Sequence, residues 1–453
     1  MKDLTIGHPL KTIVAFGLPL YFGSLLQQAY ILVDSIIIGQ HLGGKELAAL
    51  GISGPLVYFV VSIILGMAIG FSIKISQHKG AESNERIVGS IRSMLALFFC
   101  SGIVISLLSP WLATFFIWLM KVPTDIVAGT TIYTKTLLYG LIFQFLVIGI
   151  SAALRALGDS ITPLYMLFTT SVLNIVLDIV LIIYFDMGIF GAALATVITQ
   201  IIGFIALIIY VIWKNPFFSD VFVIQKTDFD GLLETLKLGV FPACQHMMLS
   251  AGILVMIWIL TPFGAAVIAA ATIVGRIEMF VVMFFSEMGS ANTTFVAQNY
   301  GKGDVLRVTT GFKQTLVLCA TLAIALTALI LAFPEFTVRL FTQDTNVIDI
   351  ATVYIQILFP FFTFLAMTNV MHGFLNGMGK TQVAFLCTIY SFILTRVPLT
   401  YVFGHYFGIV GFWWAGSTGW LIGFLYTFWI VTKVIKTFSY INDNKKLAMK
   451  GAC

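Results

Sequence analysis

The stretch TIVAFGLPLYFGSLLQQAYILVDSIII (residues 12–38) decides the class of this chain. Written as a helix, it is long enough to cross a hydrocarbon core of about 30 Å. Asp34 is the one charged residue in the stretch. A charged side chain at the bilayer centre costs at least about 2.5–3.5 kcal/mol unless something compensates it. We therefore expect a membrane span and assign Asp34 a functional role.

The rest of the chain has the same character, with 59% hydrophobic and 10% charged residues against about 25% charged in soluble domains. The apolar runs are continuous and do not alternate, which excludes a β-barrel and predicts an all-α polytopic membrane protein. Windows of about 20 residues give twelve predicted spans. They are 12–38, 48–75, 92–118, 131–154, 162–185, 190–213, 234–260, 266–296, 311–334, 350–374, 382–404 and 409–436.

The lysines and arginines predict the orientation. With an even number of spans both termini lie on one side, which then holds 19 of the 25 basic residues against 3 on the opposite side. Cytoplasmic segments carry the excess of Lys and Arg, so both termini are expected in the cytoplasm of a multi-pass protein of the cell (inner) membrane. The basic residues are scattered and form no stripe, so no nucleic-acid partner is expected.

An internal repeat organises the spans into two halves. A displacement of 221 residues lays FVVSIILGMAIGFSIKISQHKG (59–80) on FVVMFFSEMGSANTTFVAQNYG (280–301). The same displacement carries Tyr133 onto Tyr354 and Gly158 onto Gly379. Each half holds six spans, an even number, so the repeats are parallel, related by an axis along the membrane normal.

The repeat gives the predicted domains. They are an N-lobe over 1–213, a cytoplasmic linker over 214–233, and a C-lobe with the cytoplasmic tail over 234–453.

Polar residues in the first half predict a cation site. Asn174 and Asp178, four residues apart in SVLNIVLDIVLII, lie on one helix face. Thr196 in the next span and Asp34 add further oxygens. Such a cluster suits a Na⁺ ion, and two close carboxyl groups equally suit an exchangeable proton. The alternatives are that Asp34 and Asp178 cap a span end or reach water at the outer surface, and that Asn174 and Thr196 form ordinary interhelical hydrogen bonds.

The repeat makes this cluster particular to the first half. Asn174 corresponds to Thr395 and Asp178 to Leu399, and Asp34 falls among apolar residues around Val255. We therefore expect the ion-coupling residues to lie in the N-lobe.

The second half has intramembrane charges of its own. Arg276, Glu278 and Glu287 lie in the eighth predicted span and Arg396 in the eleventh. They either line a substrate cavity or form an internal salt bridge between helices. Tyr30, one turn before Asp34, either presents an aromatic face to a cationic substrate or packs in the core.

Several motifs are absent from the sequence. There is no Walker A loop, so ATP is not expected as a partner. No TVGYG-like filter, HExxH motif or nucleophilic-serine elbow occurs, which argues against a potassium channel and an enzyme. No cofactor other than a coupling ion is expected.

These features together resemble the multidrug and toxic compound extrusion (MATE) transporters, in particular the prokaryotic DinF-like, drug-extruding branch. The shared features are two parallel six-span halves, an Asp late in the first span, the NxxxD pair in the fifth, and Gln-x-x-Gly after the second and eighth spans. The resemblance implies a V-shaped pair of six-helix bundles. It also implies a cation site at Asp34, Asn174, Asp178 and Thr196.

The function expected is a cation-coupled antiporter that exports amphipathic, cationic organic compounds in exchange for Na⁺ or H⁺. The alternative is a lipid or polysaccharide-precursor flippase of the same superfamily. The expected partners are small organic substrates and membrane lipids, and the protein is expected to act as a monomer.

Overall fold

The computed structural model describes residues 2–222 and 229–451. Within them, the side chains of 216, 222, 229–230, 250–251, 253–258, 261 and 439–451 are not described. The described chain is helical and contains no strand. The long helices of the first half are α1 (Pro9–His41), α2 (Gly44–Gly80), α3 (Asn84–Leu119), α4 (Val127–Ala156), α5 (Ile161–Asp178) and α6 (Gly188–Lys214). Those of the second half are α8 (Phe229–Leu260), α9 (Ala265–Lys302), α10 (Val305–Ala332), α12 (Thr345–Leu358), α13 (Phe362–Gly377), α14 (Thr381–Ile389) and α15 (Val397–Gly451).

These helices confirm the predicted spans. Ten helical segments of the described chain are long and apolar enough to cross a membrane. The last of them, Thr381–Phe438, covers the two predicted spans 382–404 and 409–436, which are separated at Gly408, where the backbone is not helical. Helix α8 covers the predicted span 234–260. The chain is therefore an all-α polytopic protein with twelve membrane-crossing segments.

The internal repeat is visible in the backbone. Gly43 and Gly264, 221 residues apart, both have φ 94° with an extended ψ, a conformation that essentially only glycine adopts. They allow the sharp turn that precedes α2 and α9, whose first residues are also 221 apart. Gly158 and Gly379 form another such pair with positive φ. The two halves therefore share their turns as well as their hydropathy.

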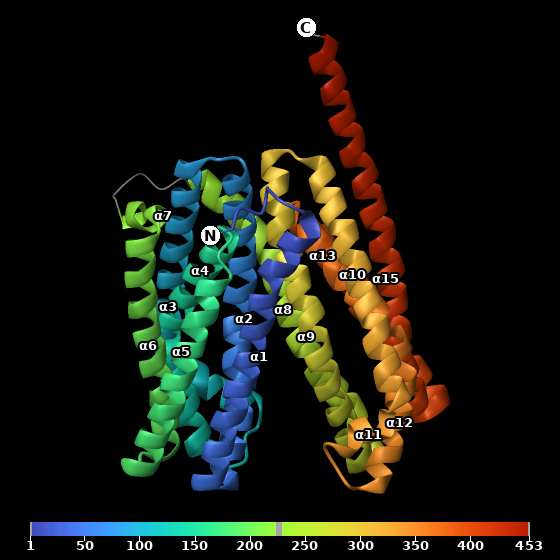
Figure 1. Ribbon diagram of the computed structural model, residues 1–453. Helices are drawn as coiled ribbons and strands as arrows, with labels where there is room; N and C mark the ends of the chain where they lie inside the picture. Colours follow the sequence, from blue (N-terminus) through green and yellow to red (C-terminus); the bar gives the residue numbers. More distant parts are fainter. Residues whose placement is uncertain (1, 223–228, 452–453) are drawn as a thin grey trace. The chain divides into compact units, whose positions relative to one another are not determined.

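The chain packs as two compact units. Unit 1 consists of Met1–Lys2 and Phe22–Met247, and unit 2 of Asp3–Tyr21 and Met248–Cys453. In unit 1, helix α4 lies at the centre and packs against α2, α3 and α6 (Figure 1). Small residues allow these contacts, since a Cβ at Gly102 would meet Ile142 and one at Gly140 would meet Val197. Close approach through small residues is the usual basis of helix packing in membranes.

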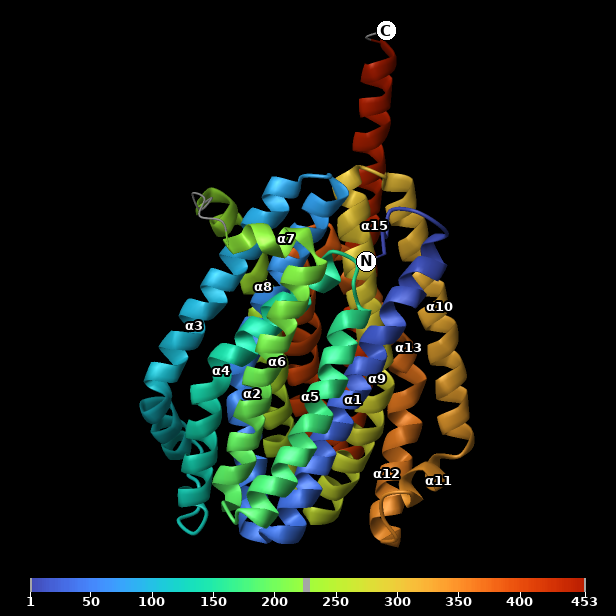
Figure 2. The same ribbon diagram turned by 60° about the vertical axis from the view of Figure 1, so that its left-hand side comes forward.

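Unit 2 repeats this plan around α13, which packs against α9, α10 and α15 (Figure 2). Gly289 on α9 and Gly373 on α13 face each other so closely that a Cβ on Gly373 would overlap the carbonyl of Gly289. The N-terminal segment also belongs to this unit. Asn299 donates to the carbonyl of Leu4, whose side chain is fully buried.

Two helices are divided between the units. The first part of α1, up to Tyr21, packs in unit 2, where a Cβ on Gly17 would meet Met288 and the ring of Tyr21 lies 5.3 Å from that of Phe284. The first part of α8, up to Met247, packs in unit 1. A Cβ on Gly66 of α2 would overlap the backbone of Ala243 there.

The packing units therefore differ from the predicted N-lobe (1–213) and C-lobe (234–453), which follow the sequence repeat. Of the predicted linker 214–233, residues 223–228 lie outside the described chain. The preceding part packs in unit 1, because Arg92 donates to the carbonyls of Asp220 and Val221 and Phe218 is fully buried. Beyond the gap, Glu234 pairs with Lys74 at 2.7 Å.

Candidate functional site

Two carboxyl groups lie together inside unit 1. Asp34 comes from α1 and Asp178 is the last residue of α5, where the helix changes to the π-helical segment η1 (Ile179–Tyr184). Asp34 is 6% exposed and Asp178 is fully buried. Single π-helical turns within α-helices occur frequently at functional sites. The change from α- to π-helix at Asp178 is therefore typical of a functional site.

The two carboxyl groups lie within hydrogen-bonding reach of each other. One oxygen of each, Oδ1, is buried and receives no hydrogen bond from the described residues. Neither carboxyl group forms an ion pair with a basic side chain of the described chain. Ionised carboxylates only accept hydrogen bonds and repel each other, so this arrangement requires a proton or a cation between them.

Asn174 and Thr196 complete the polar cluster. In the amide orientation that satisfies both of its groups, Asn174 Nδ2 donates to Asp178 Oδ2 at 2.8 Å and its oxygen accepts from Thr196 N at 3.3 Å. The hydroxyl of Tyr30 lies 3.5 Å from Thr196 Oγ1. The structure thus brings together all four residues predicted for the cation site, and Tyr30 joins them. We call these five residues the acid site.

Tyr133 lies beside the acid site and was missed as a site residue from the sequence. It lies on α4, and its side chain is 4% exposed. It is close enough to Asp34, Tyr30 and Asp178 to interact with them electrostatically. Its persistence as Tyr354 in the second half was the signal that could have singled it out.

The donor set fits a hard cation. Carboxylate, amide and hydroxyl oxygens are the ligands that ions such as Na⁺ prefer, and the two partnerless Oδ1 atoms supply acceptors that the protein itself does not use. The same atoms are equally suited to bind a proton. The site can therefore change its charge by binding or releasing a single positive ion.

The charged residues predicted in the second half are only partly brought together. Glu278 lies on α9, and Arg396 lies at the end of the π-helical segment η5 (Tyr390–Arg396). Both side chains are half-buried and interact electrostatically. Arg276 is exposed and forms no ion pair with the described residues. Glu287 is half-buried on the same helix as Glu278.

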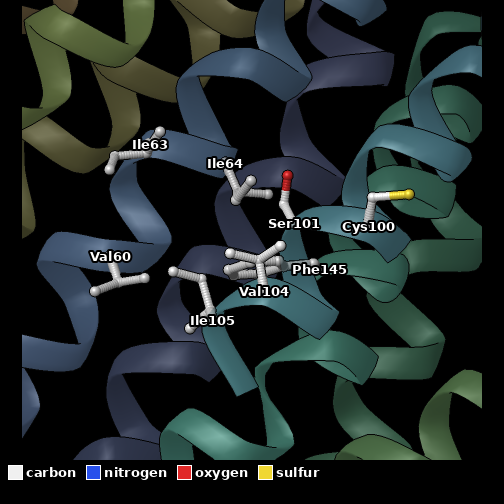
Figure 3. Close-up of a pocket in the computed structure, with 8 residues that line it drawn as sticks. All are labelled: Val60, Ile63, Ile64, Cys100, Ser101, Val104, Ile105 and Phe145. Atoms are coloured by element: carbon white, nitrogen blue, oxygen red, sulfur yellow. The ribbon is translucent and has the colours of Figure 1, made fainter. Parts of the chain in front are cut away.

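A separate pocket of about 350 Å³ lies in unit 1 between α2, α3 and α4 (Figure 3). Its lining is apolar apart from Ser101 and Cys100 and includes Val60, Val104 and Phe145. It contains none of the predicted site residues. The pocket therefore has no part in the chemistry of the acid site.

Comparisons with known proteins agree with this architecture. The MatE family model matches residues 19–180 and 242–402, which is most of the chain. The chain is 28% identical to the "Probable multidrug resistance protein YpnP" of Bacillus subtilis over 409 residues, covering 90% of this chain and 92% of that protein. It is 26% identical to the "Probable multidrug resistance protein NorM" of Thermotoga maritima, covering 89% and 88% of the two chains.

Solved structures show the same fold. A MATE protein crystallised in a bent conformation superposes with a TM-score of 0.90 at 23% identity, covering 97% of this chain and 98% of that one. A transporter of the MOP superfamily from Pyrococcus furiosus gives a TM-score of 0.86 at 23% identity, covering 96% and 98%. The matched family model, the twelve membrane-crossing segments and the repeated backbone lead to one conclusion: the chain belongs to the MatE family and is an integral, multi-pass membrane protein of the MATE type.

Proposed function

We propose that this protein is a secondary antiporter that exports amphipathic, cationic organic compounds in exchange for inward Na⁺ or H⁺. The relatives named for multidrug resistance support the export function, because their similarity extends over about nine tenths of both chains. A staphylococcal "Multidrug export protein MepA" is 22% identical over 415 residues and adds to this support.

The proposal of cation coupling rests on the geometry of the acid site. Its two carboxyl groups approach each other without a basic partner, so an ion that enters the site neutralises a repulsion between α1 and α5. Release of the ion restores that repulsion and favours a different packing of the two helices. A ligand shifts a conformational equilibrium only through different affinities for the two states. The acid site supplies that difference for the ion.

The membrane potential adds to the driving force. One elementary charge that moves through a potential of 100 mV gains about 2.3 kcal/mol. The site lies on membrane-crossing helices, so an ion that reaches it from outside and leaves to the inside crosses this field.

The protein lies in the inner membrane of the cell. From the distribution of its basic residues we expect both termini and the 214–233 segment on the cytoplasmic side. A Ser219→Cys variant in a background without the five native cysteines tests this. Ser219 is exposed, so an impermeant thiol reagent should label it in everted vesicles and not in intact cells. Labelling in intact cells would reverse the proposed orientation.

Gradient-driven transport tests the function itself. Everted vesicles that contain the protein should accumulate ethidium when they are loaded with NaCl or acidified inside, and the effective gradient identifies the coupling ion. Asp125→Asn, an exposed neutralisation in the same unit, is the control for Asp34→Asn. Accumulation that neither gradient drives, or that persists unchanged in Asp34→Asn, would overturn cation coupling at the acid site.

A further inference from the structure

Two glutamines that do not belong to the acid site lie together inside unit 1. Gln144 lies on α4 and Gln200 on α6, and Gln200 Nε2 donates to Gln144 Oε1 at 3.4 Å. The two helices run side by side (Figure 2). They approach closely one turn before the glutamines, since a Cβ on Gly140 would meet the side chain of Val197. We call Gln144 and Gln200 the amide pair.

The amide pair has an oxygen that the protein does not use. Gln200 Oε1 is buried and receives no hydrogen bond from the described residues. A buried acceptor without a partner costs about 1–3 kcal/mol. Interhelical hydrogen bonds between polar side chains are a common way to join membrane helices, but a pair with that task alone would satisfy its buried groups. The unused oxygen therefore indicates a ligand that is absent from the protein itself.

The amide pair is particular to the first half of the chain. A displacement of 221 residues places Leu365 at the position of Gln144 and Leu421 at the position of Gln200. Packing of the corresponding helices in unit 2 thus requires no polar side chain at either position. The two carboxyl groups of the acid site also correspond to apolar residues in the second half. The amide pair and the acid site therefore accompany each other in the sequence, which suggests a shared task.

The amide pair lies on the cytoplasmic side of the acid site in the proposed orientation. Gln200 follows Thr196 by four residues, which is about 6 Å along the helix, in the direction of Lys214 at the cytoplasmic end of α6. Both glutamines lie near the middle of their helices, Val127–Ala156 and Gly188–Lys214. An ion that leaves the acid site for the cytoplasm has to cross this level of the membrane.

Amide oxygens suit an ion in transit. A charge at the bilayer centre costs at least about 2.5–3.5 kcal/mol unless other groups replace its hydration shell. Side-chain carbonyl oxygens are ligands for hard cations, and they hold an ion less strongly than a carboxylate does. Passage requires binding that is favourable enough for entry and weak enough for release. An amide does not titrate as a carboxyl group does, so the amide pair suits Na⁺ and not a proton.

We propose that the amide pair is a second Na⁺ site, which the ion occupies on its way from the acid site to the cytoplasm. Gln200 Oε1 is its first ligand. Gln144 Oε1 becomes the second when the hydrogen bond between the two amides, which is long at 3.4 Å, opens. This inference rests on the proposed antiport function and names both the coupling ion and its exit path.

Leucine at either position tests this proposal, because unit 2 already has leucine at the corresponding positions. Gln144→Leu and Gln200→Leu leave the acid site intact, so equilibrium binding of radioactive Na⁺ to the purified protein in detergent should be unchanged. The initial rate of ethidium accumulation in NaCl-loaded everted vesicles should fall about tenfold, since one interaction with a charged group is lost. Gln200→Asn keeps an amide oxygen and should retain most of the wild-type rate.

Gln314→Leu on α10 is the matched control. Gln314 also has a buried Oε1 without a partner among the described residues, but it lies in unit 2. Its replacement should change neither Na⁺ binding nor the rate. An unchanged rate in Gln144→Leu and Gln200→Leu would overturn the proposal, as would a rate that falls together with equilibrium Na⁺ binding.

The same vesicles separate this proposal from the proposed function. Wild-type accumulation that a pH gradient drives and a Na⁺ gradient does not would overturn the second Na⁺ site and leave the export function intact. Accumulation that neither gradient drives would overturn both. Asp34→Asn should lose equilibrium Na⁺ binding as well as transport, whereas the leucine variants should lose only the rate.

Discussion

The two units share a backbone plan and differ in the charge of their polar sites. Each has a central helix, α4 or α13, packed by the corresponding neighbours, and corresponding glycines precede α2 and α9. In unit 1 the polar site contains Asp34 and Asp178, whereas the corresponding positions of unit 2 hold Val255 and Leu399, and unit 2 carries Glu278 and Arg396 at positions that are apolar in unit 1. The comparison teaches that the repeat preserves turns and helix contacts but not the charged side chains.

The largest expected effect concerns the two carboxyl groups of the acid site. Asp34→Asn and Asp178→Asn keep the shape of the side chain but cannot bind and release a charge. Loss of one transported charge at about 100 mV corresponds to roughly fiftyfold in the attainable dye gradient. We therefore expect ethidium accumulation in everted vesicles to fall about fiftyfold in each variant, with unchanged protein levels in the membrane.

Asp125→Asn should accumulate ethidium like the wild type. Comparable losses on neutralising Glu278, accompanied by loss of the ion dependence, would show that coupling is shared by both units and would break the comparison.

A smaller effect concerns how each unit is completed by part of a helix. Gly66 in unit 1 faces the backbone of Ala243, whereas Gly17 in unit 2 faces the flexible side chain of Met288. Backbone cannot move aside as a methionine can, so Gly66→Val should destabilise the protein more than Gly17→Val. Overpacking typically lowers the free energy of unfolding by about 1–3 kcal/mol. We expect Gly66→Val near the upper limit of this range and Gly17→Val near the lower limit.

Thermal unfolding of the purified protein in detergent measures this difference. A Cβ on Gly51, on the same helix as Gly66, would meet no atom within 4 Å, so Gly51→Val serves as the control. Equal melting temperatures for the Gly66 and Gly51 variants would contradict the packing of α8 in unit 1.

The smallest expected effect uses the corresponding tyrosines. Tyr133→Phe removes a hydroxyl beside the acid site, and Tyr354→Phe removes the corresponding hydroxyl in unit 2, where Glu278 and Arg396 are the charged groups that act on it. Loss of one hydrogen-bonding group changes an affinity by about threefold to tenfold. We expect Tyr133→Phe to shift the ion concentration required for half-maximal transport and Tyr354→Phe to leave it unchanged. A shift in Tyr354→Phe and none in Tyr133→Phe would contradict the assignment of ion coupling to unit 1.

The sequence predicted the spans, the repeat and four of the five residues that lie together in the acid site. Bilayer thickness imposes a length on every apolar run, and a charge within such a run is conspicuous, so Asp34 and Asp178 were found without coordinates. The repeat then assigned the predicted cation cluster to the first half.

Other features depend on packing between distant residues. Periodicity shows that Arg276 and Glu278 do not face each other on a helix, but not that Arg396 approaches Glu278. Tyr133 was not predicted as a site residue, because an aromatic residue in an apolar span is common and gives no signal of function. The division of α1 and α8 between the units was also not predicted, because close contacts through small residues such as Gly17 and Gly66 leave no mark in hydropathy.

The division of α1 has a consequence for biosynthesis. The segment Asp3–Tyr21 is synthesised before unit 1 is complete, whereas the rest of its own unit begins at Met248. At about 5–20 residues per second, the ribosome needs roughly ten to fifty seconds to produce the intervening chain. The helix is stable in the bilayer by itself, because its backbone hydrogen bonds are internal. Phe16 and Leu20, however, lack most of their native neighbours until the rest of unit 2 has been synthesised. Assembly of unit 2 thus depends on a helix that must remain in the bilayer without its native contacts while residues 22–247 are synthesised.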